Sequence, residues 1–425
     1  MWRIAKRPAI WMAWALLAAS IVEARACPFC SAPSLTLSEQ AARADAVALG
    51  RWRSVQRPTK KTAIAGDVGS GGHTNYEVAE VLRGKLVRPQ QTIVVARERT
   101  AKRDEFFLLL GERIGDHYEW DTTESISRAA FRYLAEAPPP DKDQPDRLRY
   151  FLRFLEHADQ SISNDAFSEL ANAPYDEIVR ARSVLPREEL RRWIADPQTS
   201  LSRTGVYGLL LGLCGNADDA RWLEARILQK SADDEFRVSL DGQIGGYLVL
   251  TGNAGLEVIE RNLLRGDEVK FSDRYAGMQA LRFAWDYGGD RFSKERLRAA
   301  MRALLDDEDL LDLVIGDLSR WEDWSIQDRL METFHDETLG TPAVRRAIVR
   351  FLFACSRKKT TDGNAPPEHA AQARRNLETV KSLDPRVFQN VERFFRFETE
   401  SADKLGPEKA EASTKSKSST KSERP

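Results

Sequence analysis

Two cysteines near the start of the chain, Cys27 and Cys30, have a spacing that serves several kinds of chemistry. A Cys-x-x-Cys pair can be a redox dithiol, part of a metal site, a lipid attachment point or a local disulfide. A redox dithiol lies at a helix N-terminus after a strand, where the helix dipole lowers the thiol pKa. An apolar leader precedes Cys27 instead, which argues against redox catalysis. A zinc site needs two further ligands, and none is suitably spaced nearby.

The leader itself has the three parts of an export signal. Basic residues precede an apolar core at 9–22, which is too short for a stable membrane span. Ala24 and Ala26 place small residues where signal peptidase requires them. We therefore predict a signal peptide at 1–26 and a mature protein that begins at Cys27, exported to the periplasm or secreted by a bacterium. Arg25 and the missing leucine depart from a lipobox, which disfavours a lipoprotein.

Other residues that could perform chemistry are few or poorly placed. The chain has only five histidines and no His-Glu-x-x-His motif. His117 has acidic neighbours, but successive strand residues point to opposite faces, which favours a polar surface. The glycine-rich segment 66–76 lacks the Gly-Lys-Ser/Thr ending of a phosphate loop and leads into a predicted strand, which favours a hairpin loop. We expect no catalytic, cofactor-binding or metal-binding residues, and hence no enzyme.

Composition narrows the possible partners. The chain carries 64 Lys and Arg against 65 Asp and Glu, for a net charge of −1, so no long-range field recruits nucleic acid. No apolar run after the leader is long enough for a membrane span, so none is expected after signal cleavage. Cys214 and Cys355 lie in apolar helical segments and are expected to be buried thiols.

The hydrophobic period is short between residues 38 and 120. Runs at 44–55, 74–84, 91–99 and 105–113, with a last one after residue 116, are bounded by polar or glycine-rich turns, as in a small β-barrel or sandwich. A short helix with Ser38 as its N-cap should precede them, and a second helix should follow.

Several of these residues resemble the netrin-like or TIMP-like module over roughly residues 27–135. The matching positions are Gly50-Arg51, the strand from Tyr76 to Gly84, and the run from Phe107 to Gly111. The resemblance implies a five-stranded OB-type barrel, which we place at 27–137.

The same resemblance also implies an alternative function, because TIMP-like inhibitors chelate a protease zinc through the amine and carbonyl of their first cysteine. Cys27 would then regulate or inhibit an envelope metalloprotease. The family pattern is Cys-x-Cys, however, and this chain has no cysteine between Ser31 and Leu213.

The period becomes helical after a Pro-rich linker at 138–145. Leu148, Phe151, Leu152 and Leu155 share one helix face. Two apolar, glycine-bearing helices, each followed by a Gly-Asn turn and an amphipathic helix, place Asn216 and Asn253 37 positions apart. A two-helix unit of that length resembles HEAT-like repeats, which we place at 146–398. The glycines of these helices predict close helix–helix approach.

The last residues, 399–425, are rich in Lys, Ser and Glu and should be disordered. The chain is therefore expected to be multidomain, with a small OB-type β-barrel followed by an α-helical HEAT-like array, a combination that resembles exported bacterial proteins. We expect a non-enzymatic scaffold or adaptor that binds an unidentified envelope protein through its helical surface. A local Cys27–Cys30 disulfide should fix the mature N-terminus against the barrel.

Overall fold

The computed structural model describes residues 35–57, 72–229, 237–266, 268–358 and 367–405, without the side chains of residue 144 and residues 396–405. The predicted signal peptide, Cys27 and Cys30 lie outside these residues. The chain divides into two compact units between Pro186 and Arg187. The predicted linker, 138–145, belongs to the first unit, and the domain boundaries given by the sequence stay predictions.

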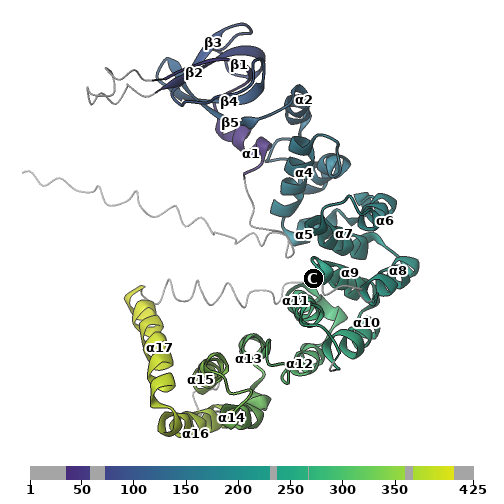
Figure 1. Ribbon diagram of the computed structural model, residues 1–425, viewed down its shortest axis with the longest axis vertical. Coiled ribbons are helices and arrows are strands. Elements are labelled where there is room, and N and C mark those ends of the chain that lie inside the picture. The colour runs from purple at the N-terminus through teal and green to yellow at the C-terminus, as the bar shows by residue number, and fades with distance from the viewer. Residues whose placement is uncertain (1–34, 58–71, 230–236, 267, 359–366, 406–425) are drawn as a thin grey trace, which may run out of the picture. The chain divides into compact units, whose positions relative to one another are not determined.

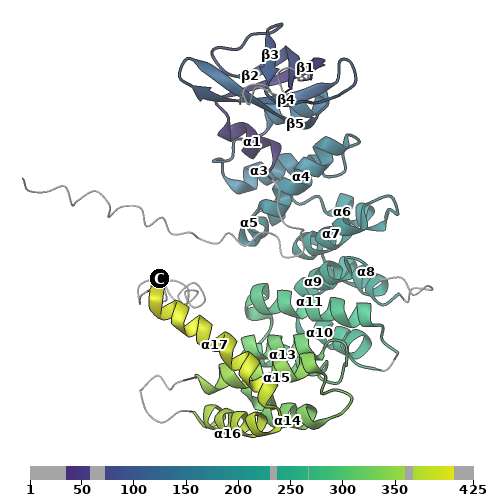
Figure 2. The same cartoon turned by 60° about the vertical axis from the view of Figure 1, so that its left-hand side comes forward.

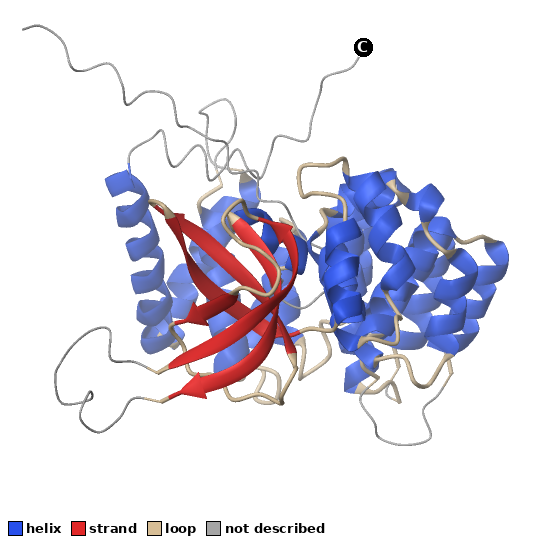
Figure 3. Cartoon of the chain, turned by 90° about the horizontal axis from the view of Figure 1, so that it is seen from above, coloured by secondary structure: helices blue, strands red, loops and turns tan. Residues whose placement is uncertain are grey.

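The first unit contains an antiparallel sheet of five strands in the order β3-β2-β1-β4-β5, labelled in Figure 1 and red in Figure 3. β1 is central because it pairs with both β2 and β4. The strands overlap the segments predicted from the short hydrophobic period, and three of them, β1, β2 and β4, extend one residue beyond the predicted range. They are β1 (Ala46–Gln56), β2 (His73–Arg83), β3 (Thr92–Val95), β4 (Phe106–Ile114) and β5 (His117–Ser125).

One face of this sheet forms an apolar core. Tyr76 and Val78 on β2 and Phe107 and Leu109 on β4 are buried in the same cluster. The Tyr76 and Phe107 rings meet edge to face, with centroids 5.5 Å apart. Tyr76 and Val78 are more deeply buried than their neighbours on the strand, as the alternation in the sequence predicts. Burial of such side chains stabilises the sheet by about 1.5–3 kcal/mol each.

Helices flank the strands in the first unit. They are α1 (Leu37–Arg43), α2 (Arg128–Glu136), α3 (Gln144–Phe151), α4 (Gln160–Asn172) and α5 (Tyr175–Arg180). The N-cap of α1 is Thr36, which forms a capping box with Glu39. The prediction of Ser38 as N-cap is wrong, because Ser38 lies inside the helix with its side chain buried. The four apolar residues predicted to share a face after the linker are all buried, in α3, in the short 3-10 turn that follows it and at Leu155 just after that turn.

The second unit is helical throughout its described residues. Its helices are α6 (Arg187–Ala195), α7 (Leu201–Cys214), α8 (Ala217–Ile227), α9 (Leu240–Thr251), α10 (Asn253–Ile259), α11 (Phe271–Tyr287), α12 (Lys294–Arg302), α13 (Leu311–Arg320), α14 (Gln327–His335), α15 (Pro342–Ser356), α16 (Glu368–Leu383) and α17 (Pro385–Leu405). α7 packs on α9, α9 on α11, and α13 on α15 (Figure 2). α17 ends inside the segment predicted to be disordered, 399–425, and residues 406–425 lie outside the described part.

Glycines bring α7 and α9 into direct backbone contact. A Cβ atom on Gly246 would lie 2.0 Å from the carbonyl oxygen of Gly208, and one on Gly212 would lie 2.4 Å from the Cα of Gly246. Neither position has room for a methyl group, so the close approach predicted from these glycines is confirmed. The two Gly-Asn turns differ: Asn216 caps α8, whereas Gly252 adopts a left-handed conformation with φ of 60° before α10.

A five-stranded antiparallel sheet followed by helices therefore confirms the coarse fold class, a chain with a β-rich N-terminal part and a long α-helical remainder. Closure of the sheet into an OB-type barrel and a HEAT-like arrangement of the helices stay predictions.

Candidate functional site

The cysteines divide into two groups. Cys27 and Cys30, the predicted disulfide, lie outside the described residues. Cys355 is buried and its thiol donates to the carbonyl oxygen of His369 at 3.4 Å, while Cys214 is half-buried. Burial raises the pKa of each of these two thiols to about 11. A thiol that stays protonated is a poor nucleophile, so Cys214 and Cys355 have the character of core residues.

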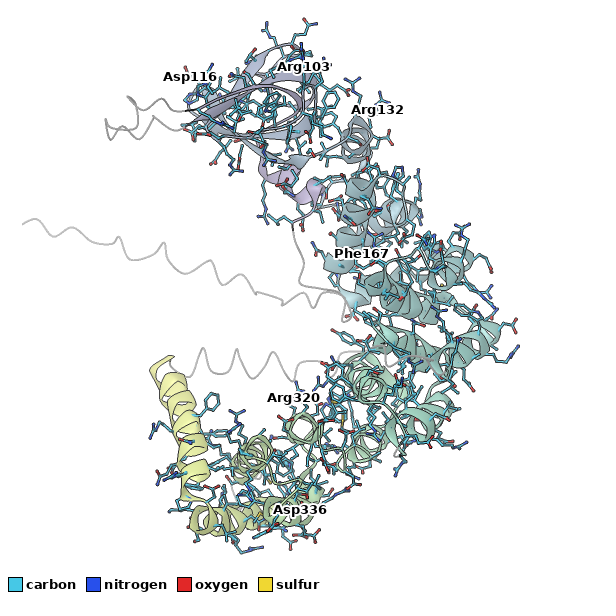
Figure 4. All side chains as sticks on the ribbon, viewed as in Figure 1. Arg103, Asp116, Arg132, Phe167, Arg320 and Asp336 are labelled. Carbon is cyan, nitrogen blue, oxygen red and sulfur yellow. The ribbon has the colours of Figure 1, made fainter. Side chains whose placement is uncertain are left out.

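The polar residues near His117 do not converge. His117 Nδ1 lies 3.4 Å from a carboxylate oxygen of Asp116, and both side chains are exposed (Asp116 is labelled in Figure 4). Within the described ranges no group of three or more His, Cys, Asp or Glu side chains is arranged to hold a metal ion. The glycine-rich segment leads into β2 at His73, as predicted, and its residues up to 71 lie outside the described part.

A buried charged cluster joins three helices of the first unit. Arg147 on α3 forms an ion pair with Glu169 on α4, and each side chain is at most 6 % exposed. Ser38 on α1 donates to Glu169, and Arg147 also donates to the carbonyl oxygen of Pro138 at 2.6 Å. An unpaired buried charge is energetically costly, and here the charges of Arg147 and Glu169 are paired with each other. It positions α1 against α3 and α4.

Asp165 lies next to this cluster on α4. Its two oxygens accept hydrogen bonds from the Leu37 amide at 2.6 Å and from the Tyr133 hydroxyl at 2.9 Å. Burial raises the pKa of Asp165 to about 6, and the nearby negative charge of Glu169 acts in the same direction. The Asp165 carboxyl therefore changes charge close to neutral pH while it holds the first turn of α1.

A series of ion pairs crosses the second unit. Each pair joins residues 32 to 36 positions apart in the sequence. The members are Arg187 with Asp219, Arg237 with Asp273, Arg274 with Asp307, Arg282 with Asp317, and Arg296 with Glu260. We call them the ion-pair series. The acids are largely or fully buried, and each pair links one helix, or the turn beside it, to the second helix along the chain.

Three acids of the ion-pair series bind more than one arginine, and one of them is Glu260, which pairs with Arg265 and with Arg296. Asp219 accepts from Arg187 at 2.6 Å and from Arg191 at 3.3 Å. Asp317 accepts from Arg282 at 2.7 Å and also pairs with Arg320, labelled in Figure 4. Burial alone would raise the pKa of Asp219, but hydrogen bonds from Arg187 and the Asn216 amide outweigh it and hold that pKa below its ordinary value.

Asp219 and Asp307 also lie near helix starts, where a carboxylate can cap the helix. Asp219 does complete a capping box with Asn216, and Asp307 accepts from the amide of Leu310. Their arginine partners were missed. The two pairs are 32 and 33 positions apart, which is shorter than the 37 positions between Asn216 and Asn253, so a search at the predicted repeat length would not have found them.

The tryptophans of the second unit are part of its packing. Trp285 and Trp321 stack in parallel with centroids 4.4 Å apart. The Lys294 ammonium lies 4.2 Å from the centre of the Trp285 ring. Trp321 is buried, and Trp285 is half-buried. Since the two rings cover each other, they fill space between helices.

Two grooves lie on the surface of the second unit. One of about 540 Å³ lies between α13 and α15, and one of about 530 Å³ lies beside α10 and the start of α11. Both have the volume of ordinary ligand or peptide sites. Such a surface can bind a partner.

The described helices are all too short or too polar to cross a membrane. Compared with known proteins, the chain matches no family model, and no curated protein is significantly similar to it.

Proposed function

We propose that the chain is an exported, non-enzymatic interaction protein of the cell envelope. In this proposal an N-terminal OB-type barrel is followed by a HEAT-like helical array, and the surface of the array binds another protein. Arrays of this kind present extended surfaces for partners.

The observation that carries the proposal is the ion-pair series. Its separation of 32 to 36 residues is close to the repeat length suggested by Asn216 and Asn253. Arg282 to Asp317, for example, joins α11 to α13, which are the first helices of successive pairs. A contact that recurs between equivalent helices is what a stacked two-helix repeat requires, because each unit contacts only its neighbours.

Contacts between the two outer strands support the barrel. Arg97, just after β3, pairs with Asp121 on β5 at 3.3 Å, and Arg99 pairs with Glu124 at 3.5 Å. β3 and β5 are the two ends of the strand order, so their approach favours a sheet that curls toward closure.

The alternative function, inhibition of an envelope metalloprotease, depends on a free amine at Cys27 and stays a prediction. N-terminal sequencing and intact-mass measurement of the exported protein test it directly. A mature chain that begins elsewhere, or that carries a blocked or lipidated amine, would exclude it.

Site-specific photo-crosslinking in producing cells tests the interaction function. A benzophenone amino acid replaces Leu201 or Phe271, which are exposed on the second unit, in separate full-length chains. Matched controls carry it at Val94 or Ile114, equally exposed apolar residues of the sheet. The proposal predicts a reproducible crosslinked envelope protein from at least one helical position. Crosslinks from the sheet positions alone, or from none, would contradict it.

A further inference from the structure

The groove between α13 and α15 has a floor of small side chains. α15 contributes Ala343 and Ala347, which are four residues apart and therefore share a face of the helix. α13 contributes Gly316 and Ser319, and Phe395 of α17 also lines the groove. A Cβ atom on Gly316 would meet no atom within 4 Å. The floor is therefore open rather than filled by neighbouring side chains.

Two arginines line the same groove. Arg346 and Arg350 are exposed and lie one turn apart on α15, so their Cβ atoms are about 6 Å apart. Arg350 lies over the Phe394 ring at 5.6 Å. Asp312 lines the groove from α13, yet neither arginine forms an ion pair with it or with any other described acidic side chain. Among the described residues, the groove thus offers two unpaired positive charges against the one negative charge of Asp312, whereas the arginines of the ion-pair series are already paired with acids.

We infer that this groove binds an acidic peptide segment of another protein. Carboxylates of the segment pair with Arg346 and Arg350, since a guanidinium and a carboxylate form strong, directional hydrogen bonds. An apolar side chain of the segment occupies the open space over Gly316, where burial of its apolar surface favours binding. This inference rests on the proposed interaction function and names the chemistry of its partner.

The chain's own last residues are a poor match for the groove. Residues 406–425 carry more basic than acidic side chains: Lys409, Lys415, Lys417, Lys421 and Arg424 against Glu408, Glu411 and Glu423. Charge complementarity therefore favours a separate acidic partner.

Selection from a displayed library of random peptides tests the inference. The library is selected in parallel on the full-length mature chain, on the double variant Arg346→Glu/Arg350→Glu, on Gly316→Leu and on the control Arg375→Glu. Arg375 is exposed on α16 and does not line the groove. Gly316→Leu should keep the fold, because the space at Gly316 is open and its backbone is helical. Circular dichroism and thermal unfolding check each variant.

Peptides that combine Asp or Glu with Leu, Phe or Met should be enriched on the wild-type chain and on Arg375→Glu. They should be lost from the other two variants. In fluorescence anisotropy, replacing the acids of a selected peptide by their amides should weaken binding about tenfold or more, and about 1 M salt should do the same, because the Debye length falls to about 3 Å.

Enriched peptides without acids, or peptides that bind folded Gly316→Leu as well as wild type, would overturn the inference. So would binding that appears only when the chain ends at Leu405, which would make the tail the occupant. The photo-crosslinks distinguish the two failures: a partner attached at Leu201 or Phe271 would preserve the interaction function even if no acidic peptide bound the groove.

Discussion

Asp165 is a buried carboxyl that holds the start of α1 through the Leu37 amide and the Tyr133 hydroxyl. Burial raises its pKa to about 6, against about 3.9 in an unfolded chain. Between those two values the folded state keeps a proton that the unfolded state has released. Stability contributed by Asp165 is therefore lost as pH rises from about 4 to about 6.

Asp165→Asn should remove that loss, because the amide oxygen still accepts from Leu37 while no charge forms. We expect the variant to be more stable than wild type at pH 8, by up to about 3 kcal/mol, and no more stable at pH 4. The free energy of unfolding in urea measures this difference, with hydrogen exchange of peptides from residues 128–172 as the probe of unfolding. A variant that is less stable at pH 8 would show that the ionised carboxylate is needed.

Asp159, in the same unit, is a control because its carboxyl pKa is shifted in the opposite direction. Burial acts to raise its pKa, but hydrogen bonds from the Ser127 hydroxyl and the Ser161 amide outweigh it and lower that pKa. Its contribution is present above about pH 4 and is lost as pH falls further. Asp159→Asn should therefore destabilise the protein at pH 7, and its difference from wild type should shrink in acid.

The ion-pair series provides a second prediction at the residue scale. Asp317 is fully buried and binds two arginines, so Asp317→Ala leaves both without their acid. We expect a loss of about 3 kcal/mol in the free energy of unfolding, measured by far-ultraviolet circular dichroism in urea. Asp306→Ala is the matched control, because Asp306 is 82 % exposed where it pairs with Arg329 and should cost under about 1 kcal/mol. Equal losses would show that burial does not govern these pairs.

At the scale of elements, α7 and α9 pack through glycines rather than through interlocking side chains. Gly246→Ala would place a methyl group 2.0 Å from the Gly208 carbonyl oxygen, so the two helices must separate. We expect a loss of more than about 2 kcal/mol in unfolding free energy, since core overpacking typically costs 1–3 kcal/mol. Gly316→Ala, on α13, is the control: its space is open, and alanine should stabilise that helix by about 0.5–1 kcal/mol. A tolerated Gly246→Ala would mean that the helices can shift apart cheaply.

Features that are marked by a pattern of neighbouring residues could be predicted from the sequence. Alternation around Tyr76 predicted β2, and the glycines of α7 and α9 predicted their close approach. The N-cap of α1 was missed although Thr36 and Glu39 form the capping-box pattern in the sequence. The pairing of Arg147 with Glu169, and of Arg282 with Asp317, could not be predicted from local sequence pattern. Which of many arginines meets which acid depends on how helices far apart in sequence pack together.

At the scale of the whole chain, both compact units keep buried charge by pairing it across helices. The first unit does so around Arg147 and Glu169, and the second along the ion-pair series. Neither unit depends on a disulfide among its described residues, because Cys214 and Cys355 are free. Cys27 and Cys30 are the other two cysteines of the sequence, so a disulfide within the chain would have to join them.

The predicted Cys27–Cys30 disulfide implies a distinct labelling pattern for the purified protein. Without reductant, a thiol reagent should label neither pair in the native state, because the predicted disulfide would join Cys27 to Cys30 and because burial raises the pKa values of Cys214 and Cys355 to about 11. In denaturant, only Cys214 and Cys355 should react, as peptide mass spectrometry would show. The double variant Cys27→Ser/Cys30→Ser should give the same pattern in both states. Labelling of all four thiols in unreduced, denatured wild type would exclude the disulfide, and rapid labelling of native Cys214 or Cys355 would show that these thiols are accessible and reactive.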